Sequence, residues 1–428
     1  MKKIIIVGGG AGGLELATLL GKKLGKLGKA EITLIDKNTN HLWKPLLHEI
    51  ATGTLNDELD HVSYFSQAQN NSFIFKQGQL INIDRDNKVI ELNDVIDHEN
   101  QVIFPKTSLS YDLLVIAIGS TSNDFGTPGV KEYCTFLDDQ ESAKRFRKSI
   151  LSTFFRFSSG IEKNEKLNIA IVGAGATGVE LTTELFRMIK TLGQYGFEKL
   201  EPSLLNITLI EATDRILPAL PENVSKNIQT KLEELGAIVL TKTKIVKADN
   251  NHFYPEDEAP IPADIMMWTA GVKAADFLKD LAGLETNRVN QLIVKPTLQT
   301  TRDDSIFAIG DCTCCAKAEG GFTPATAQAA HQMASICAVN IVSIINNETL
   351  KHFQYNNKGT IISLANTAQG VIKTIGKNQM GVKGWIASCI YRMLYRLHQI
   401  ALFGPFKTFR LARANKVYRS VRTTINMN

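Results

Sequence analysis

Several features that would place a chain in a special class are missing from this sequence of 428 residues. The start, MKKIIIVGGG, passes from two lysines directly into a strand-like run and a glycine turn, without the apolar segment and cleavage site of a secretion signal. No uninterrupted apolar run reaches the roughly 20 residues that span a bilayer. We therefore expect the protein on the cytoplasmic side of a membrane.

Cysteine is scarce, and three of the six cysteines are clustered at Cys312, Cys314 and Cys315. In a cytoplasmic chain these are expected to be thiols rather than disulfides. The CTCC segment also lacks the second ligand pair of a zinc site. The sequence therefore predicts ordinary buried or half-buried thiols here and no metal site.

Acidic residues are absent from the C-terminal region, because the last one is Glu348. Residues 349–428 contain thirteen Lys and Arg, so the net charge of +5 divides into +13 for this region and −8 for the first 348 residues. A basic region on an acidic body indicates an anionic partner, either nucleic acid or a lipid surface.

The segment 384–406, GWIASCIYRMLYRLHQIALFGPF, has the apolar period of a helix. Its apolar residues share one arc, while Arg392, Arg396 and Gln399 lie opposite, and more basic residues follow: Lys407, Arg410, Arg413, Lys416, Arg419 and Arg422. The broad apolar face disfavours nucleic acid and favours a helix in the membrane interface with arginines towards anionic headgroups. A helix docked on its own protein, or a homodimer contact, is the alternative. The apolar arc consists of Ile386, Ile390, Met393, Leu394, Leu397, Ile400 and Ala401.

With 44% hydrophobic and 21% charged residues, the chain can bury a full core, and its length suggests two or three domains. Strand-like and helical runs alternate, which is typical of α/β architecture. The most informative pattern is an internal duplication. IIIVGGGAGGLEL (4–16) returns as IAIVGAGATGVEL (169–181), and the strands ITLID, ending at Asp36, and ITLIE, ending at Glu211, follow.

Each part of this repeat has a role in binding a dinucleotide. The first glycine permits a tight turn, the second lets the backbone approach a pyrophosphate, and the third lets the helix pack on the strand. Asp36 and Glu211 would accept hydrogen bonds from ribose hydroxyls, and Glu211 would repel a 2′-phosphate, so the second unit should prefer NAD(H). The predicted binding glycines are Gly8, Gly10, Gly12 and Gly13, and then Gly173, Gly175 and Gly178.

The acidic residues lie further from the glycines than in the simplest form of the motif, which has about 20 residues between them. Asp36 follows Gly8 by 28 residues, and Glu211 follows Gly173 by 38. Inserted segments such as GKKLGKLGKAE and LGQYGFEKLEPSLLN explain the excess, because they lengthen a helix or loop without moving the strand.

Further strands predict how the two units are connected. Residues 111–120 should complete the first unit and 263–272 the second, after which 305–311 begins a segment leading into a helix. We therefore predict two Rossmann-like domains, the second inserted in the first. The predicted ranges are 1–120 with 290–348 for the first domain, 121–289 for the second, and 349–428 for a membrane-association region.

These features resemble the two-dinucleotide-domain flavoprotein reductases. The segments HLWKPLLHEIATG, IGSTSNDFGTPGV, WTAGVKA, LQTTRDDSIFAIGDC and TAQAAHQMA narrow the resemblance to the type II NADH:quinone oxidoreductases, above all the proteobacterial respiratory enzyme. The resemblance covers nearly the whole chain. It implies a peripheral membrane enzyme on the cytoplasmic face of the cell membrane that passes electrons from NADH through FAD to ubiquinone or menaquinone without pumping protons.

The resemblance also implies roles for individual residues. Asp311 would contact the ribityl chain of FAD, Gln328 and Gln332 would border the flavin ring and the quinone, and Glu180 would lie near the flavin and nicotinamide. The remaining implied contacts are Lys44, Pro45, Gly119, Gly310 and Ala327 for FAD, and Gly271 for NADH. Gln328 and Gln332 stand one helical turn apart and are therefore expected on one face.

Some of these residues have a second interpretation. Glu15 holds the same offset in the first repeat as Glu180 in the second, so both could reflect a preference for acids near a helix start. His331 is more typical of a packing or surface histidine than of a catalyst. The superfamily's redox CxxxxC is absent from the stretch HLWKPLLHEIATG, so electrons need an external acceptor.

Two other functions remain open from the residues alone. One is a soluble NADH-dependent reductase of a small redox protein, and the other is a low-turnover regulatory flavoprotein that binds NADH. Sulfide:quinone reductases share the scaffold, but they need cysteines flanking the flavin, and the cysteine pattern here does not fit.

Overall fold

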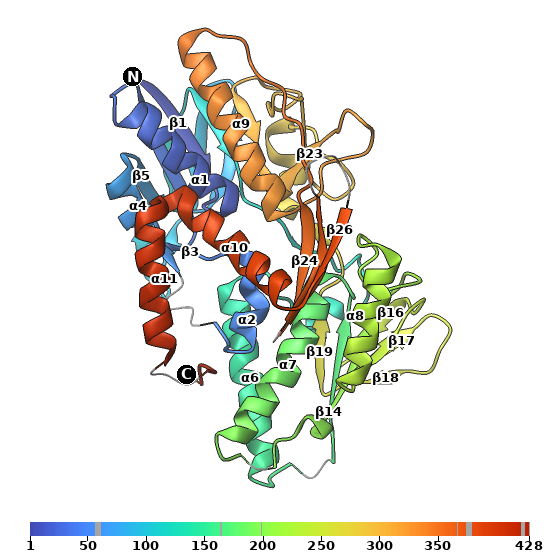
Figure 1. Ribbon diagram of the computed structural model, residues 1–428. Coiled ribbons are helices and arrows are strands. Elements are labelled where there is room, and N and C mark those ends of the chain that lie inside the picture. The colour runs from blue at the N-terminus through green and yellow to red at the C-terminus, as the bar shows by residue number, and fades with distance from the viewer. Residues whose placement is uncertain are drawn as a thin grey trace.

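The computed structural model describes residues 1–55, 61–162, 165–197, 199–365, 367–373, 379–420 and 424–427. Its first nucleotide unit is built on a parallel five-stranded sheet of order β22-β11-β1-β2-β5 (Figure 1). The apolar runs of its central strands are buried, as expected for a sheet covered on both faces. The strands are β1 (Lys2–Val7), β2 (Ala30–Asp36), β5 (Ile74–Gln77), β11 (Leu113–Ile116) and β22 (Ile306–Ala308).

The second unit repeats this arrangement on a four-stranded sheet of order β15-β14-β13-β19. Within both sheets the duplicated strands pair in the same register, Val7 opposite Ile35 and Val172 opposite Ile210. The strands are β13 (Leu167–Val172), β14 (Leu205–Ile210), β15 (Ile238–Leu240) and β19 (Ile265–Trp268). Because β22 follows the whole second unit in sequence yet pairs with β11, the second unit is inserted in the first, as predicted.

Helices cover both sheets. Helix α1 packs against α9 in the first unit, and α7 packs against α2, which reaches across from the first unit. The excess residues between glycine motif and acid form a π-helical turn at Gly21–Gly25 in the first unit and a long α7 plus loop in the second. The helices are α1 (Ala11–Leu20), α2 (Leu47–Ala51), α4 (Tyr64–Asn71), α5 (Val130–Tyr133), α6 (Gln140–Ser158), α7 (Ala176–Gln194), α8 (Glu222–Glu234) and α9 (Ala327–Asn346).

Short strands and turns connect these layers, and in the part of the chain that the structure describes they form seven small sheets, one of them C-terminal. Short 3-10 turns occur at Lys44–Leu46, Pro202–Leu204, Asp276–Gly283 and Gly310–Cys312. The remaining strands before residue 349 are β3 (Asn40–His41), β4 (Val62–Ser63), β6 (Leu80–Asp84), β7 (Val89–Leu92), β8 (Val95–Ile96), β9 (Val102–Phe104), β10 (Thr107–Ser110), β12 (Thr121–Ser122), β16 (Ile245–Ala248), β17 (His252–Pro255), β18 (Ile261–Pro262), β20 (Val272–Lys273), β21 (Leu292–Val294) and β23 (Thr313–Cys315).

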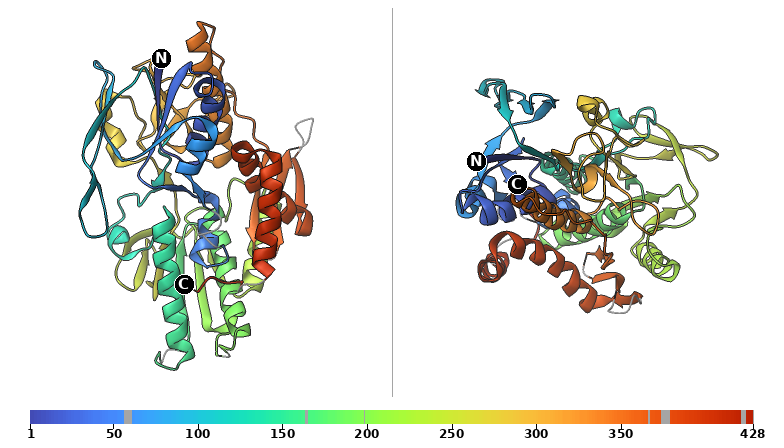
Figure 2. Two further views of the ribbon diagram at one scale, coloured as in Figure 1. Left: turned by 90° about the vertical axis from the view of Figure 1, so that its left-hand side faces the viewer. Right: turned by 90° about the horizontal axis from the view of Figure 1, so that it is seen from above.

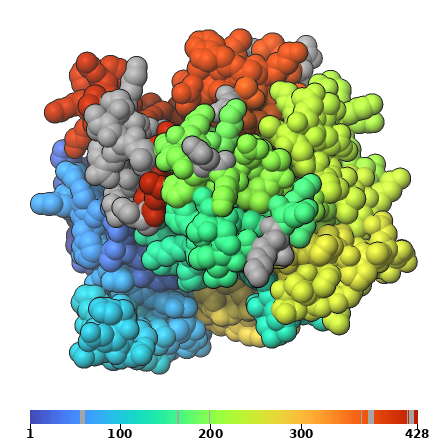
Figure 3. Space-filling view, turned by 90° about the horizontal axis from the view of Figure 1, so that it is seen from below, coloured from blue at the N-terminus to red at the C-terminus, as the bar shows by residue number. Residues whose placement is uncertain are grey.

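The C-terminal region begins with an antiparallel sheet that the sequence patterns did not predict. Strands β24 (Gly359–Leu364), β25 (Thr367–Lys373) and β26 (Gln379–Lys383) precede helices α10 (Gly384–Phe403) and α11 (Pro405–Ser420). Strand β24 contacts α7, and α10 contacts both this sheet and α1. The two views in Figure 2 place α10 and α11 together on one flank of the molecule, and in the view from below most of the orange and red C-terminal atoms lie along one edge (Figure 3).

Helix α10 carries its apolar arc outward. Met393 and Ile386 are each 58% exposed, whereas the opposite side of the helix, with His398 and Gln399, is buried. Gln399 lies opposite the apolar arc, as predicted, and this side of the helix packs on the protein. The helix is amphipathic, but its polar residues divide, because His398 and Gln399 are buried while Arg392 is exposed. Arg422 lies outside the described residues, as do the side chains of Lys416 and Arg419.

Among the described helices, α9 is the one that is long and apolar enough to cross a membrane, by length and composition only. Half of its most apolar window is buried inside the structure. Its buried side, with Ala330 against Gly12 of α1, makes it a core helix of the first unit.

Candidate functional site

The two glycine motifs form loops of similar conformation between strand and helix. Gly8 and Gly173 have φ of +103° and +101°, a left-handed conformation that favours glycine. A Cβ on Gly13 would stand 1.8 Å from the carbonyl oxygen of Gly8, and a Cβ on Gly178 would stand 2.0 Å from that of Gly173. These positions therefore exclude any side chain, which confirms the predicted helix-on-strand packing in both units.

The middle glycines have a different environment. A Cβ built on Gly10 or on Gly175 would meet no described atom within 4 Å, and the same holds for Gly119. Gly10 and Gly175 are also the N-caps of α1 and α7, where unpaired N–H groups and the helix dipole favour an anion. Open space at these positions fits the approach of a pyrophosphate to the backbone.

The acids that end the second strand of each unit hold these loops in place. Asp36 Oδ2 accepts a hydrogen bond from the N–H of Gly9 at 2.7 Å, and Glu211 Oε2 accepts one from Ala174 at 3.0 Å. Burial raises the pKa of Asp36, an effect that hydrogen bonds from Asn38 and Gly9 partly offset. Both carboxylates thus lie beside the phosphate loop, where a ribose would meet them.

A third group of predicted residues meets at the carboxyl end of the first sheet. Ser120 Oγ donates to Asp311 Oδ2 at 3.1 Å, and Lys44 Nζ donates to the carbonyl of Ser120 at 2.9 Å. Gly119 and Gly310 both have positive φ and flank this group. The structure therefore brings together Lys44, Gly119, Gly310 and Asp311, although 267 residues separate the first from the last.

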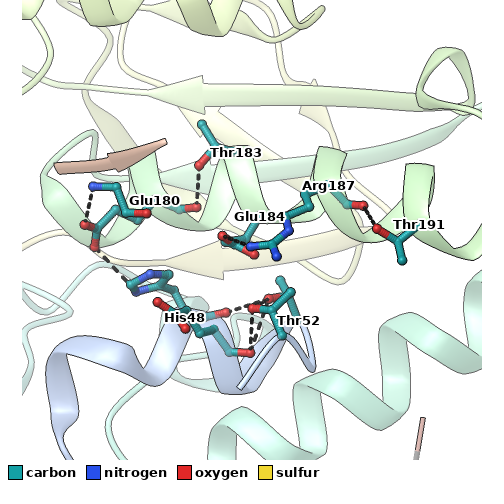
Figure 4. Close-up of polar contacts among 10 residues, drawn as sticks. His48, Thr52, Glu180, Thr183, Glu184, Arg187 and Thr191 are labelled. Atoms are coloured by element: carbon teal, nitrogen blue, oxygen red, sulfur yellow. Dashed lines mark hydrogen bonds and ion pairs between the residues drawn. The ribbon is translucent and has the colours of Figure 1, made fainter. Parts of the chain in front are cut away.

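Glu180 is buried at the junction of three parts of the chain (Figure 4). Its Oε1 accepts the backbone N–H of Ser363 in β24 at 2.9 Å, and its Oε2 lies 3.4 Å from Nδ1 of His48 in α2. Burial raises the pKa of Glu180 to about 8 and lowers that of His48 to about 4. At neutral pH both groups are therefore uncharged, so their contact is not an ion pair.

Glu184 lies one turn further along α7, as Figure 4 also shows. Burial raises the pKa of Glu184, and the nearby Arg187 guanidinium, 3.3 Å away, partly offsets this. Tyr391 of α10 faces Glu180 from the C-terminal side, and burial together with the charge of Glu180 raises its pKa far above the ordinary value. The sequence reasoning missed His48, Ser363 and Tyr391, because no motif connects them to Glu180.

Gln328 and Gln332 do share one face of α9, as predicted, and both amides bind the segment leading into β24. Gln332 accepts the N–H of Asn356 and donates to its carbonyl, both at 2.9 Å. Gln328 accepts the N–H of Lys358 at 2.8 Å and donates to the carbonyl of Gly359 at 3.4 Å. In this structure the two amides connect α9 to the C-terminal region, and a direct role at a quinone stays a prediction.

Other predicted site residues lie nearby or apart. Pro45 is the second residue of the 3-10 turn that Lys44 begins, Ala327 is the first residue of α9, and Gly271 has positive φ beside the ring of Phe125. All six cysteines are free, and burial raises the pKa of Cys312 and Cys315 to about 11, which keeps both protonated. Within the described ranges, no group of three His, Cys, Asp or Glu side chains could hold a metal ion.

Sequence comparison places the chain among known proteins. The family model of the pyridine nucleotide-disulphide oxidoreductases matches residues 2–334. The chain is 46% identical to a type II NADH:quinone oxidoreductase of Haemophilus influenzae over 100% of both chains, and 32% identical to one of Staphylococcus aureus over 89% of this chain and 92% of the relative.

Comparison with solved structures gives the same fold. The structure of NDH2 from Plasmodium falciparum in complex with NADH superimposes with a TM-score of 0.81 at 21% identity, covering 100% of this chain and 99% of that one. The predicted resemblance is thereby confirmed, and neither alternative function is favoured. With its duplicated phosphate loops and full-length relatives, the chain belongs to the pyridine nucleotide-disulphide oxidoreductases and, within them, to the type II NADH:quinone oxidoreductases, which transfer electrons from NADH to a quinone.

Proposed function

We propose that the chain binds FAD on the first nucleotide unit and NADH on the second, and that it reduces a membrane quinone from the cytoplasmic surface of the membrane. The observation that carries this proposal is the position of Glu180. It is a buried, protonated acid that lies between the second unit, α2 of the first unit and the C-terminal region. An acid in this position can supply a proton where the two nucleotide units meet.

The residues of the first unit are suited to bind FAD. The turn at Gly8, the open backbone at Gly10 and Gly119, and the carboxylate of Asp36 suit a dinucleotide, and Lys44 with Asp311 adds polar groups further along the sheet edge. FAD, when bound, accepts hydride from NADH and returns two electrons to the quinone. The protein contributes position, charge and exclusion of water.

Quinone reduction to quinol takes up two electrons and two protons, and NADH with its hydride brings the equivalent of one of those protons. Glu180 is suited to hold the other. Because Oε1 accepts the N–H of Ser363, the proton is left to Oε2, on the side of His48. A pKa of about 8 keeps the acid protonated at neutral pH and still allows it to release a proton.

Membrane attachment is supported by the outward apolar face of α10 and by the charge of +13 in residues 349–428. The apolar side chains continue into α11, where Phe406 is 86% and Phe409 62% exposed. An apolar face among arginines fits the interface of an anionic lipid surface. A homodimer that buries the same face is the second candidate.

Stopped-flow half-reactions test the proposed chemistry. Full-length protein loaded with FAD is mixed with NADH, and the reduced protein is then mixed with a soluble quinone. For Glu180→Gln we expect near-normal reduction by NADH and re-oxidation by quinone slowed about 100-fold, within the usual range of general acid catalysis. Equal loss in both half-reactions would show that Glu180 positions nicotinamide instead.

Vesicle sedimentation tests the membrane surface. The double variant Met393→Asp and Leu397→Asp changes two exposed side chains of α10 and should lose binding to vesicles containing anionic lipid. A matched control with Ile96→Asp and Ile103→Asp changes two exposed apolar residues of the β8–β9 hairpin and should bind normally. Dimer dissociation without change in vesicle binding would favour the homodimer.

A further inference from the structure

A buried hydrogen-bonded cluster joins four separate elements of the first unit and the C-terminal region. Glu15 of α1 accepts from His398 of α10 at 2.6 Å and is also bonded to His331 of α9. His398 Nε2 lies 2.9 Å from His41 Nε2, and His41 Nδ1 lies 2.9 Å from the carbonyl oxygen of Gly9. Glu15, His41 and His398 are each at most 3% exposed.

The acceptors at both ends of this cluster determine where its protons lie. The carbonyl of Gly9 only accepts, so His41 must donate from Nδ1. Burial lowers the pKa of His41 to about 3, so this ring is neutral and its Nε2 accepts from His398. Burial raises the pKa of Glu15, but the hydrogen bonds from His331 and His398 outweigh it and leave it below its ordinary value. Glu15 therefore accepts hydrogen bonds from the rings of both His398 and His331.

The far end of the cluster is the phosphate loop itself. Gly9 lies between the turn at Gly8 and the cap of α1, and its carbonyl also accepts from Tyr64 Oη at 2.8 Å. In the second unit the corresponding carbonyl, that of Ala174, accepts only a backbone N–H in the described contacts, from Leu217 at 2.9 Å. The first loop is therefore held by side chains, and one of these is in turn held by α10.

A second contact of His398 leads to the other predicted flavin residues. Its ring packs on Trp43 with centroids 4.3 Å apart and an interplanar angle of 31°. Trp43 directly precedes Lys44, which donates to Ser120 beside Asp311. His398 of α10 thus contacts His41, which is hydrogen-bonded to the phosphate loop, and Trp43, which precedes Lys44.

We propose that His398 is a positioning residue for the cofactor of the first unit, and that docking of α10 and retention of FAD therefore stabilise each other. The proposal rests on the proposed function in one respect, namely that the first unit binds FAD. Its physical basis is linkage: a cofactor that favours the ordered loop must favour the docked helix by the same factor.

Affinity for FAD tests the proposal directly. In His398→Phe, His41 loses its donor and Glu15 is left buried with one partner fewer, so we expect the dissociation constant for FAD to rise at least about tenfold. His398→Gln, which keeps one donor, should lie between this variant and the wild type. His352→Phe is the matched control, since His352 is exposed in the same region, and it should bind FAD normally.

Two readouts separate positioning from a general loss of stability. FAD should raise the melting temperature of the wild-type protein, and this increase should be smaller in His398→Phe. If the substitution has a purely structural effect, the melting temperatures without and with FAD fall equally. That result would overturn the proposal. If His398→Phe does not fold, the rate of trypsin cleavage of wild-type α10 at Arg392 and Arg396 tests the proposed linkage instead. It should be several-fold faster without FAD, and equal rates refute the linkage. Wild type that fails to bind FAD would instead overturn the proposed function.

Discussion

The two nucleotide units share a strand, glycine loop and helix, but the carboxylates at equivalent positions in them have pKa values shifted in opposite directions. Glu15 and Glu180 each lie seven residues after the first glycine of their motif, and both are buried. Glu15 receives two histidines, and its pKa falls, whereas Glu180 receives one backbone N–H and a neutral histidine, and its pKa rises to about 8. The groups that surround each carboxylate therefore determine whether it is charged, and its position in the duplicated motif does not.

Neither acid lies in the first turn of its helix, where the helix dipole acts most strongly. Both acids instead meet the C-terminal region, Glu15 at His398 and Glu180 at Ser363 and Tyr391. In the first unit this contact creates a charged structural cluster, and in the second it creates a neutral acid suited to proton transfer.

The largest expected effect comes from removing the two carboxylates in turn. Glu15→Gln removes a buried carboxylate that two histidines contact and should lower the free energy of unfolding by about 3–5 kcal/mol. Glu180→Gln replaces an acid that is already neutral at pH 7 and should change the free energy of unfolding by less than about 1 kcal/mol. Chemical denaturation of both full-length variants measures this, and similar losses would refute the contrast.

The pH dependence should also differ between the two acids. The folded pKa of Glu180 lies above the ordinary 4.5, so its contribution to stability is present at low pH and is lost as pH rises from about 4.5 through 8. The folded pKa of Glu15 is lowered, so its contribution is present above 4.5 and is lost as pH falls further.

The rate of re-oxidation by quinone should also depend on the titration of Glu180. Re-oxidation by quinone should fall about tenfold per pH unit above roughly pH 8, where Glu180 has lost its proton. Rapid-mixing measurements from pH 6 to 10 would show this slope. Glu180→Gln should give a flat and low profile, and an unchanged slope in this variant would assign the proton to another group.

A smaller effect is expected at the two acids that we propose meet a ribose, Asp36 and Glu211. Glu211→Gln keeps an acceptor for the N–H of Ala174 but removes the charge that repels a 2′-phosphate. The ratio of kcat/KM for NADH over NADPH should drop about tenfold, which corresponds to 1.4 kcal/mol. Asp36→Asn in the first unit is the control and should leave this ratio unchanged.

The smallest effect is expected at Gln332. Gln332→Leu removes two hydrogen bonds to the backbone of Asn356, and we expect a loss of about 1 kcal/mol in the free energy of unfolding with both half-reactions slowed alike. If Gln332 instead donates to the quinone, only re-oxidation falls. Comparing the two half-reactions in this variant separates a connecting role from a direct one.

The strand, glycine and acid pattern predicted most of the fold and the conformation of both glycine loops. This succeeded because each motif acts locally: Gly8 needs a left-handed turn, and Gly13 needs close packing, wherever the rest of the chain goes. The exposed apolar arc of α10 was also legible from helical period. The β24–β26 sheet escaped prediction, because its strands are short and carry no motif of their own.

The contacts that give the site its chemistry could not be read from the sequence. His398 reaches Glu15 across 383 residues, and Ser363 reaches Glu180 across 183. The expectation that His331 packs or lies at the surface agrees with its half-exposed ring, yet its bond to Glu15 was not foreseen.

Local sequence determined the two glycine loops that we propose bind nucleotides, because a turn, a helix start and an acid-ended strand are each encoded within about forty residues. It also determined that the C-terminal region is basic and apolar on one helical face. Only the tertiary structure decided which buried acid is charged and which is neutral. A carboxylate's charge depends on how much water it loses and which donors replace that water, and at Glu15 and Glu180 those donors come from distant parts of the chain.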